Sequence, residues 1–551
     1  MRKVLLAASL IFISLLFITG CGNEQSGEAT IDGGLAAERY AVIAWNDLGM
    51  HCMDHDYSVF AILPPYNNLH AQLIDRLTGK PVTSGVTLTY QATTDTRGSI
   101  NTTSKGKTNF WEWVYSLFGV QLKENMGLAG NPVQGLKPAP MKYDQVAGFW
   151  KADGIPTIPY DDKGNSNYYS MVKIVAKDRR GAVLATTRTV LPVSDEMACS
   201  HCHTSGTGDP AAQPTPDWVY DTNPEKDWKR NILLLHDNRN LGKDLYTGAL
   251  AQNGYAAEGL LPTSDSGKPI LCANCHGSNA LGKPGVTGIR QLTTSIHSWH
   301  AVKAMDDNTG MPLDETLDRT GCYYCHPGST TQCLRGIMGI AKNPDGSSKL
   351  ECQSCHGRMS RVGADGRTGW VDLPKCQNCH YRSDSGQYVQ DTSAFDASGN
   401  FREAESIFST GGALYKLGAT HGNMQCESCH GSTHAEYATG EANDNVQSSH
   451  LQGYPGVIAE CSACHLWSLP LTANGGPHGL HTIGTIWLYT HIAAAKNNLK
   501  DCAVCHGEDY KGTRLSMTFT ARRFSFGPIR KTYAQGEMVG CYDCHNGPVK
   551  K

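Results

Sequence analysis

Nine copies of the pattern Cys-x-x-Cys-His lie between residues 199 and 545 and use 18 of the 21 cysteines in this chain of 551 residues. Two thiols at this spacing can add across the vinyl groups of a haem, and the adjacent histidine then lies beneath the iron as its proximal ligand. The pattern therefore predicts nine covalently attached c-type haems. The expected attachment residues are Cys199, Cys202, Cys272, Cys275, Cys322, Cys325, Cys352, Cys355, Cys376, Cys379, Cys426, Cys429, Cys461, Cys464, Cys502, Cys505, Cys541 and Cys544. The expected proximal iron ligands are His203, His276, His326, His356, His380, His430, His465, His506 and His545.

Two other kinds of site also use paired cysteines. Zinc ribbons bind their metal through two Cys-x-x-Cys pairs, and the pairs that begin at Cys352 and Cys376 have nearly the spacing of a ribbon. Disulfides are common in exported chains. Neither alternative accounts for the histidine, which follows every Cys-x-x-Cys pair although only 22 residues of the chain are histidine. Haem attachment explains the whole pattern.

The spacing of the motifs leaves little chain for each haem. Successive motifs begin 24 to 73 residues apart, so they form no regular repeat, and residues 199–545 supply about 39 residues per motif. With so little chain around each large apolar ring, porphyrin must replace much of the side-chain core. Neighbouring haems must then be enclosed by the same stretches of chain and lie close together. Haems that lie this close can exchange electrons, so the spacing favours electron transfer.

Thirteen histidines lie outside the motif position, which is enough to give every haem a second histidine ligand. The expected distal ligands are His236, His297, His300, His421, His434, His450, His478, His481 and His491. His201, inside the first motif, could also reach a neighbouring haem. Methionine is the other common distal ligand and raises the reduction potential. Because histidine is abundant, we expect few methionine ligands, low potentials and irons without an open position for a substrate.

Helices are expected to position several of these ligands. An apolar stripe of helical period from Ile289 to Trp299 predicts a helix there. His297 and His300 are three residues apart, hence on one face of that helix, where they could cap two neighbouring haems. A second helix is expected around His491.

Residues 38–192 contain no haem motif and alternate between strand-like runs and turns. The runs rich in β-branched and aromatic residues are Tyr40–Trp45, Tyr57–Leu63, Val86–Tyr90, Tyr169–Ala176 and Ala182–Val190. They predict an antiparallel β-sandwich, with a helix at Trp111–Phe118 inside a long insertion. The expected fold class is therefore mixed: a β-sandwich-like domain over residues 38–192, then a mostly α-helical and irregular, haem-dominated domain over residues 193–551.

The segment Gly49–Asp56 concentrates groups that could bind a metal. His51 or His55 could be a distal haem ligand, or the segment could hold a separate metal ion. Alternatively it is a loop whose Cys52 forms a disulfide with Cys333, because these two cysteines remain once Cys21 and the haem thiols are assigned. His70 could also face the first haem.

Residues 1–20 have the layout of a lipoprotein signal peptide. Two basic residues precede the apolar run Val4–Ile18, which is too short to span a bilayer. The small residues before Cys21 resemble a bacterial lipobox, in which Cys21 is lipidated; an ordinary signal peptide with an incidental cysteine is the alternative. No Asp directly follows Cys21, and by resemblance to bacterial lipoproteins this favours the outer membrane. Residues 21–37 are polar and predict a flexible tether.

The overall composition excludes some classes of protein. The formal net charge is −3, so no basic excess points to nucleic acid. Hydrophobic residues make up 40% of the chain, which argues against wholesale disorder and against a protein with many membrane spans.

Several motif surroundings resemble those of the multihaem c-type cytochromes of metal-respiring bacteria, of the outer-membrane lipoprotein type. They are Cys272–Gly277, Cys322–Gly328, Gln332–Gly336 and Cys352–Gly357. The resemblance covers residues 199–545 well and residues 38–192 less closely. It implies electron transfer at the cell envelope or surface. The resemblance itself supplies no partner or acceptor; the partners we expect are redox proteins of the envelope, such as a donor cytochrome or a porin–cytochrome conduit, and extracellular electron acceptors.

Three functions compete at this stage. The favoured one is an electron carrier that passes respiratory electrons to extracellular acceptors such as ferric minerals, in effect a non-selective ferric reductase. The second is an enzyme acting on nitrogen or sulfur oxyanions, which would need one haem with an open distal position. Nitrite-reducing relatives often carry a Cys-x-x-Cys-Lys site, and none occurs here. The third is a subunit of a polymerised cytochrome filament, which an anchored N-terminus disfavours.

Overall fold

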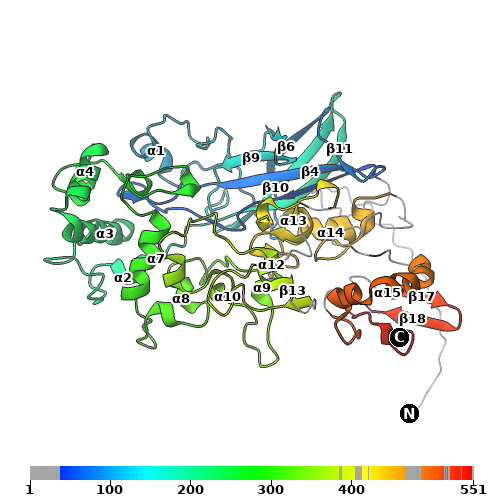
Figure 1. The fold of residues 1–551 in the computed structure, drawn as a ribbon. Coiled ribbons are helices and arrows are strands. Elements are labelled where there is room, and N and C mark those ends of the chain that lie inside the picture. The colour runs from blue at the N-terminus through cyan, green and yellow to red at the C-terminus, as the bar shows by residue number, and fades with distance from the viewer. Residues whose placement is uncertain are drawn as a thin grey trace, which may run out of the picture. The chain divides into compact units, whose positions relative to one another are not determined.

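The structure is a computed structural model that describes residues 38–383, 388–403, 413–419, 421–466, 485–513, 522–534 and 537–548, and residues 481, 516 and 518. Within these ranges, two five-stranded sheets form the front of the chain (Figure 1). The first sheet contains β1 (Tyr40–Trp45), β4 (Asn67–Asp75), β9 (Phe149–Ile155) and β8 (Lys142–Asp144), with β5 (Lys80–Pro81) paired to β4. The second contains β2 (His51–Cys52), β11 (Val183–Ser194), β10 (Tyr169–Asp178), β6 (Val86–Thr93) and β7 (Ala139–Pro140).

The two sheets share one apolar core, as a sandwich requires. Alternate residues of a strand point to one face, and Leu69, Ala71 and Leu73 of β4 pack in one cluster with Val172 and Ile174 of β10. Neighbouring strands are antiparallel, except that β2 pairs parallel to the end of β11. The mixed fold class and the β-rich front are therefore confirmed.

Most strands expected from the sequence are present, and α1 (Phe110–Phe118) matches the expected helix. The expected strand Tyr57–Leu63 is mostly wrong. Only Phe60–Ala61 is extended into a strand, β3, which pairs with β12 (Ile270–Leu271). Around it, the carboxylate of Asp54 accepts hydrogen bonds from the backbone amides of Ile62 and Leu63, so side-chain contacts replace the expected ladder.

From residue 199 onward most motifs lie on a single helical turn. Because residues three and four apart share a helix face, such a turn brings the two thiols and the histidine to one side. The motif turns are α2 (Ser200–His203), α6 (Cys272–Cys275), α8 (Thr320–Tyr323), α10 (Cys352–His356), α12 (Cys376–Cys379), α13 (Cys426–His430), η6 (Cys461–Ala463), the end of α15 (Thr485–His506) and η10 (Cys541–Asp543).

Further helices and hairpins connect these turns. The helices are α3 (Pro224–Asn240), α4 (Asp244–Gln252), α5 (Leu260–Asp265), α7 (Leu292–Lys303), α9 (Ile337–Ile340), α11 (Met359–Val362) and α14 (Val446–Gln452), with 3-10 turns η1 (Asn279–Leu281), η2 (Leu313–Glu315), η4 (Tyr415–Leu417) and η5 (His421–Asn423). The hairpins pair β13 (His380–Arg382) with β14 (Tyr388–Gln390), β15 (Gly431–Ser432) with β16 (Ala435–Glu436), and β17 (Arg522–Phe526) with β18 (Ile529–Tyr533). No helix in the described ranges combines the length and the apolar content needed to cross a bilayer.

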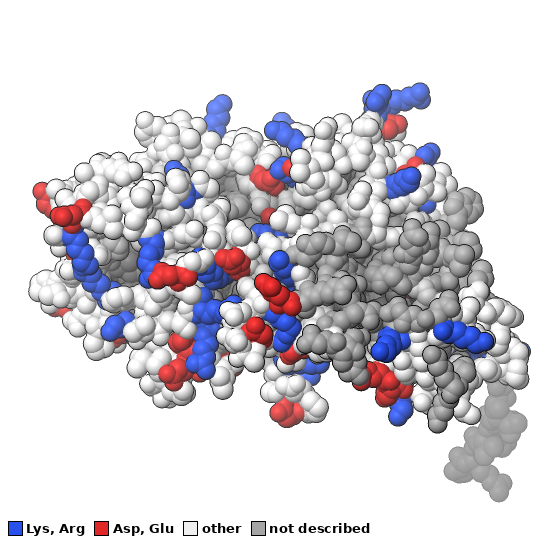
Figure 2. All heavy atoms as spheres, viewed as in Figure 1, with Lys and Arg blue, Asp and Glu red and all other residues white. Residues whose placement is uncertain are grey.

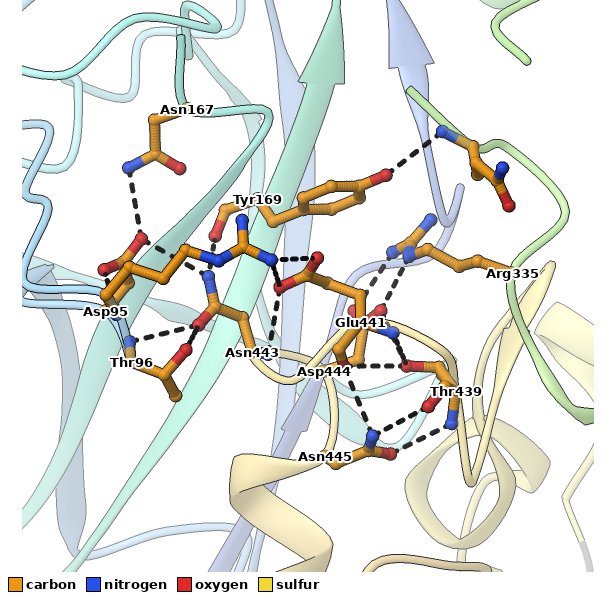
Figure 3. Close-up of polar contacts among 12 residues, drawn as sticks. Asp95, Thr96, Asn167, Tyr169, Arg335, Thr439, Glu441, Asn443, Asp444 and Asn445 are labelled. Atoms are coloured by element: carbon orange, nitrogen blue, oxygen red, sulfur yellow. Dashed lines mark hydrogen bonds and ion pairs between the residues drawn. The ribbon is translucent and has the colours of Figure 1, made fainter. Parts of the chain in front are cut away.

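The motif region packs on the sandwich through α13 and α14 (Figure 1). The buried amide of Gln447 on α14 bonds both to the backbone N–H and to the carbonyl of Ala44 on β1, each at 2.8 Å. Beside it lies the polar network of Figure 3, in which Asn443 accepts from Thr96 and Glu441 pairs with Arg97. Side chains of both regions therefore satisfy one another's buried polar groups.

Candidate haem sites

Seven motif histidines, counted over the described residues, each face one histidine from elsewhere in the chain. The distances between ring centroids fall between 6.0 and 6.4 Å. The pairs are His203 with His300, His276 with His236, His326 with His297, His356 with His434, His465 with His421, His506 with His481, and His545 with His491. All seven partners belong to the nine distal ligands expected from the sequence.

The spacing of these pairs fits one iron between two rings. An imidazole nitrogen lies about 2 Å from a bound transition metal and its ring centroid about 1 Å further, so two rings on opposite sides of one iron have centroids about 6 Å apart. Chance contacts between buried aromatic rings would scatter more widely in distance and would not join a motif histidine to a non-motif one each time. The residues present therefore fit the haem that the motifs imply.

Two helices each carry ligands for two sites. Helix α7 holds both His297 and His300, whose partners belong to different motifs. Helix α15 holds His491 near its start and His506 at its end, and these pair with His545 and His481. A helix that supplies two sites fixes their separation, because its residues are rigidly spaced.

Hydrogen bonds fix which ring nitrogen is available to a metal. On α7, Nδ1 of His297 and of His300 lie 2.7 Å from the carbonyl oxygens of Thr293 and Ile296. A carbonyl can only accept, so Nδ1 carries the proton and Nε2 is left for iron. The same arrangement holds Nδ1 of His276, His506 and His545, at 2.9, 2.7 and 2.8 Å from backbone carbonyls. These acceptors could not be predicted from the sequence, because every residue type has a backbone carbonyl.

The surroundings also keep these rings neutral. Burial, followed by the charge of a neighbouring histidine, lowers the pKa of His203, His236 and His297 to about 4. Burial lowers the pKa of His356 to about 3, and His434 adds to the effect. At neutral pH these imidazoles are unprotonated at one nitrogen, which is the form that binds a metal.

Other candidates from the sequence are placed differently. His450 lies exposed on α14, and the contacts of the described residues bring no motif histidine to it. His201 bonds to Asp307 at 2.7 Å on the surface. His380 follows α12 as the first residue of β13, and His430 is the last residue of α13. His478 lies outside the described residues.

The segment Gly49–Asp56 does not form the separate metal site that was one alternative for it. His51 is buried against the ring of Tyr66, with centroids 3.9 Å apart, and His55 bonds to Asp195 at 2.9 Å. The described residues contain no group of three or more His, Cys, Asp or Glu side chains that could hold a metal ion. This finding disfavours both a separate metal at this segment and a zinc ribbon at Cys352 and Cys376.

The remaining contacts of this segment are structural. His70 bonds to Asp153 at 3.1 Å on the face of β4 opposite the sandwich core, and its ring contacts Trp45 and Phe149. Cys52 and Cys333 carry no disulfide in the structure, as is true of the motif cysteines, and the disulfide considered for them stays a prediction. Cys333 instead lies 3.7 Å from Nδ1 of His434.

Cysteine pairs on single turns, together with paired histidines at the spacing of an iron, are the features of a multihaem c-type cytochrome. Residues 347–511 match the family model of outer membrane cytochrome MtrC/MtrF-like proteins, domains II/IV. This part of the chain holds five of the nine motifs. The match supports a multihaem outer-membrane cytochrome of the kind found in metal-respiring bacteria, and the resemblance inferred from the motifs is confirmed. Neither the curated proteins nor the solved structures contain a match to this chain.

Proposed function

We propose that this protein binds nine c-type haems and passes respiratory electrons, across or at the cell envelope, to extracellular acceptors such as ferric minerals. The observation that carries the proposal is the set of seven histidine pairs whose ring centroids are separated by the distance that fits one iron between two imidazoles. When bound, c-type haem supplies one-electron chemistry at iron. The assignment of His450 and His478 as distal ligands stays a prediction from the sequence.

The residues of this chain would bind the haems and orient the ligand histidines. The motif cysteines would hold each porphyrin, and helices such as α7 and α15 hold the ligand rings against carbonyl acceptors. Two histidines would ligate each iron, which would leave no position for a substrate. Transfer to an acceptor then depends on access and driving force, and not on a shaped pocket with convergent polar groups.

The surface charge of the polypeptide is consistent with a protein that does not select among electron acceptors. On the face drawn in Figure 2, cationic and anionic side chains of the described residues are interspersed, and the net charge of the whole chain is only −3. The polypeptide on this face therefore does not steer strongly toward one sign of charge, and the propionates would add about −1 for each bis-histidine ferric haem.

The test is stopped-flow oxidation of the reduced holoprotein by chelated ferric iron, a quinone analogue, nitrite and hydroxylamine. We expect broad reactivity ordered by driving force. Fast turnover of nitrite or hydroxylamine alone, with slow reduction of iron, would instead favour the alternative, a multihaem enzyme of nitrogen or sulfur oxyanions with one open haem.

The stoichiometry and the anchor have separate tests. Intact mass should exceed the processed polypeptide by nine haems and the lipid, and seven or fewer haems would contradict the motif assignment.

We also propose that Cys21 is lipidated and anchors the protein in the outer membrane, on its periplasmic or cell-surface face. Cys21→Ser should move the holoprotein from the membrane fraction to the soluble fraction with its haem content unchanged.

A further inference from the structure

Cys333 is one of two cysteines with no place in the haem motifs or the lipobox, and it touches a ligand pair. Its Sγ lies 3.7 Å from Nδ1 of His434, whose ring faces His356 at 6.0 Å. His356 belongs to the motif that begins at Cys352. The thiol therefore stands directly behind the ring that we assign as the distal ligand of this haem.

The backbone of His434 is held in a conformation that few non-glycine residues adopt. It lies between β15 and β16 with a φ of 65°. The carboxylate of Glu436 accepts its N–H at 2.9 Å, and its carbonyl accepts from the backbone amides of Arg335 and Gly336 at 2.9 and 2.7 Å. A left-handed histidine persists only where its surroundings determine it, so the segment Cys333–Gly336 fixes both the backbone and the ring of His434.

This segment is itself anchored to the sandwich. The buried guanidinium of Arg335 makes two hydrogen bonds to Asp444, at 2.6 and 3.0 Å, and a third to the carbonyl of Gly49 at 3.2 Å. It also lies over the ring of Tyr169, 5.0 Å from the centroid (Figure 3). Cys333, two residues away, is therefore held in place, and its contact with His434 is built into the fold.

The acceptor at His434 differs in chemistry from those of other ligand rings. His297, His300 and His506 donate to carbonyl oxygens at 2.7 Å. Sulfur is a weak acceptor compared with a carbonyl oxygen. A strong acceptor makes the imidazole a more basic ligand, and a more basic ligand stabilises ferric over ferrous iron. A thiol acceptor should therefore leave the haem easier to reduce.

We propose that Cys333 is a positioning residue that accepts the Nδ1 proton of His434, so that Nε2 faces the iron, and that this contact gives the Cys352 haem a higher reduction potential than haems whose ligands donate to carbonyls. The proposal rests on the haem ligation proposed above. It gives a role to a cysteine that the haem motifs leave unexplained.

The test is a potentiometric titration of the holoprotein, followed by visible absorption and by EPR, for wild type and four variants. His434→Met identifies the component of the Cys352 haem, because a thioether ligand raises its potential most. Cys333→Ser supplies a stronger acceptor, and we expect that same component to move to lower potential. Cys333→Ala removes the acceptor, and we expect the component to move to higher potential. Cys52→Ser is the matched control and should move nothing.

Three results would overturn the proposal. In the first, the haem component identified with His434→Met keeps its wild-type reduction potential in both Cys333 variants. In the second, the component moves equally in Cys52→Ser, which would indicate a Cys52–Cys333 disulfide in the holoprotein. In the third, a different component moves. Intact mass separates these results from failure of the proposed function, because a wild-type protein without haem at Cys352 contradicts the ligation itself.

Discussion

The seven histidine pairs differ in the angle between their ring planes. The planes of His203 with His300, and of His276 with His236, are nearly perpendicular, at 81° and 87°. Three other pairs, those of His326, His506 and His545, are nearly parallel, at 16°, 14° and 15°. Axial imidazoles donate π electrons into iron d orbitals. Parallel planes therefore separate the energies of those orbitals, and perpendicular planes leave them nearly degenerate.

This difference predicts two kinds of low-spin ferric signal. The perpendicular pairs should give strongly anisotropic EPR signals with a large maximum g value, and the parallel pairs should give ordinary rhombic signals. His300→Met should remove one anisotropic signal, whereas the matched variant His491→Met should remove one rhombic signal. Low-temperature EPR of the ferric holoprotein measures both. A dominant high-spin signal would contradict histidine ligation altogether.

Part of the candidate site follows from local sequence and part does not. His297 and His300 were predictable because helical periodicity is a local property of the chain. The assignment of partners was not: His421 and His434 bracket the Cys426 motif in sequence, yet they face His465 and His356. A distal ligand must approach the opposite side of the ring from its motif, and a few residues of chain cannot cross from one side to the other.

Among the elements, α3 is joined to the front sandwich by a fully buried ion pair. The ammonium of Lys229 on α3 lies 2.8 Å from the carboxylate of Asp54, and both side chains are 0% exposed. The ammonium also donates to the carbonyl of Phe60 at 3.1 Å. Removing one member of such a pair leaves an uncompensated buried charge, which costs about 3–5 kcal/mol.

We therefore expect Lys229→Met to lower the free energy of unfolding by about that amount, measured by denaturant unfolding followed by circular dichroism. The control is Arg230→Gln on the same helix, since Arg230 pairs with Asp221 and Asp265 in partly exposed positions. A surface pair contributes about 0–1 kcal/mol, so this change should be small. Equal losses in the two variants would contradict a special role for the buried pair.

A second contact between elements predicts a dependence on pH. Glu196, just after β11, accepts hydrogen bonds from the backbone amides of residues 329–331 and from the hydroxyls of Ser329 and Thr331, including Thr331 N–H at 2.9 Å and its hydroxyl at 2.7 Å. Burial opposes ionisation of Glu196, but the hydrogen bonds from Ser329 and Thr331 outweigh it and lower its pKa from 4.5 to about 2. These contacts stabilise the fold only while the carboxylate is charged.

Because the folded-state pKa lies below the ordinary value, this stabilisation is complete above pH 4.5 and is lost as pH falls toward 2. The difference in unfolding free energy between wild type and Glu196→Gln should be constant above that pH and shrink below it. Thr331→Val removes one donor and should weaken the dependence. A difference that stays constant down to pH 2 would refute the assignment.

The elements of the front domain were only partly predictable. Strands β1, β6, β10 and β11 were predicted from runs of β-branched and aromatic residues. Strand β4 was expected only as a strand that His70 enters after Asn67 and Asn68. Its full length was not predicted because its sequence, Asn-Asn-Leu-His-Ala-Gln-Leu-Ile-Asp, is rich in residues that disfavour strands. Its polar residues are satisfied by distant parts of the chain: the buried Gln72 donates to the carbonyl of Asn423 at 2.9 Å. Such tertiary partners leave no mark on the local sequence.

At the scale of the whole molecule, the apolar core is distributed unevenly. Each of the four clusters of buried apolar side chains in the described residues includes members from residues 38–194, which hold the sandwich and its loops. Two of them extend to α3–α6, over residues up to 273, and one reaches Met424, Leu451 and Ala463. Between residues 274 and 423 the described chain contributes no buried member to these clusters. Porphyrin rings would supply the missing apolar interior there.

This distribution predicts a graded dependence of folding on haem. The sandwich and the helices to about residue 273 bury their own core, so they should fold in a chain made without haem attachment, whereas the segment beyond should not. Limited proteolysis of the apoprotein, read by mass spectrometry, should leave a protected fragment that starts near residue 38 and ends soon after α6. The holoprotein treated in parallel should resist cleavage throughout its motif region. An apoprotein protected equally up to residue 466 would show that side chains alone suffice to hold the motif region together.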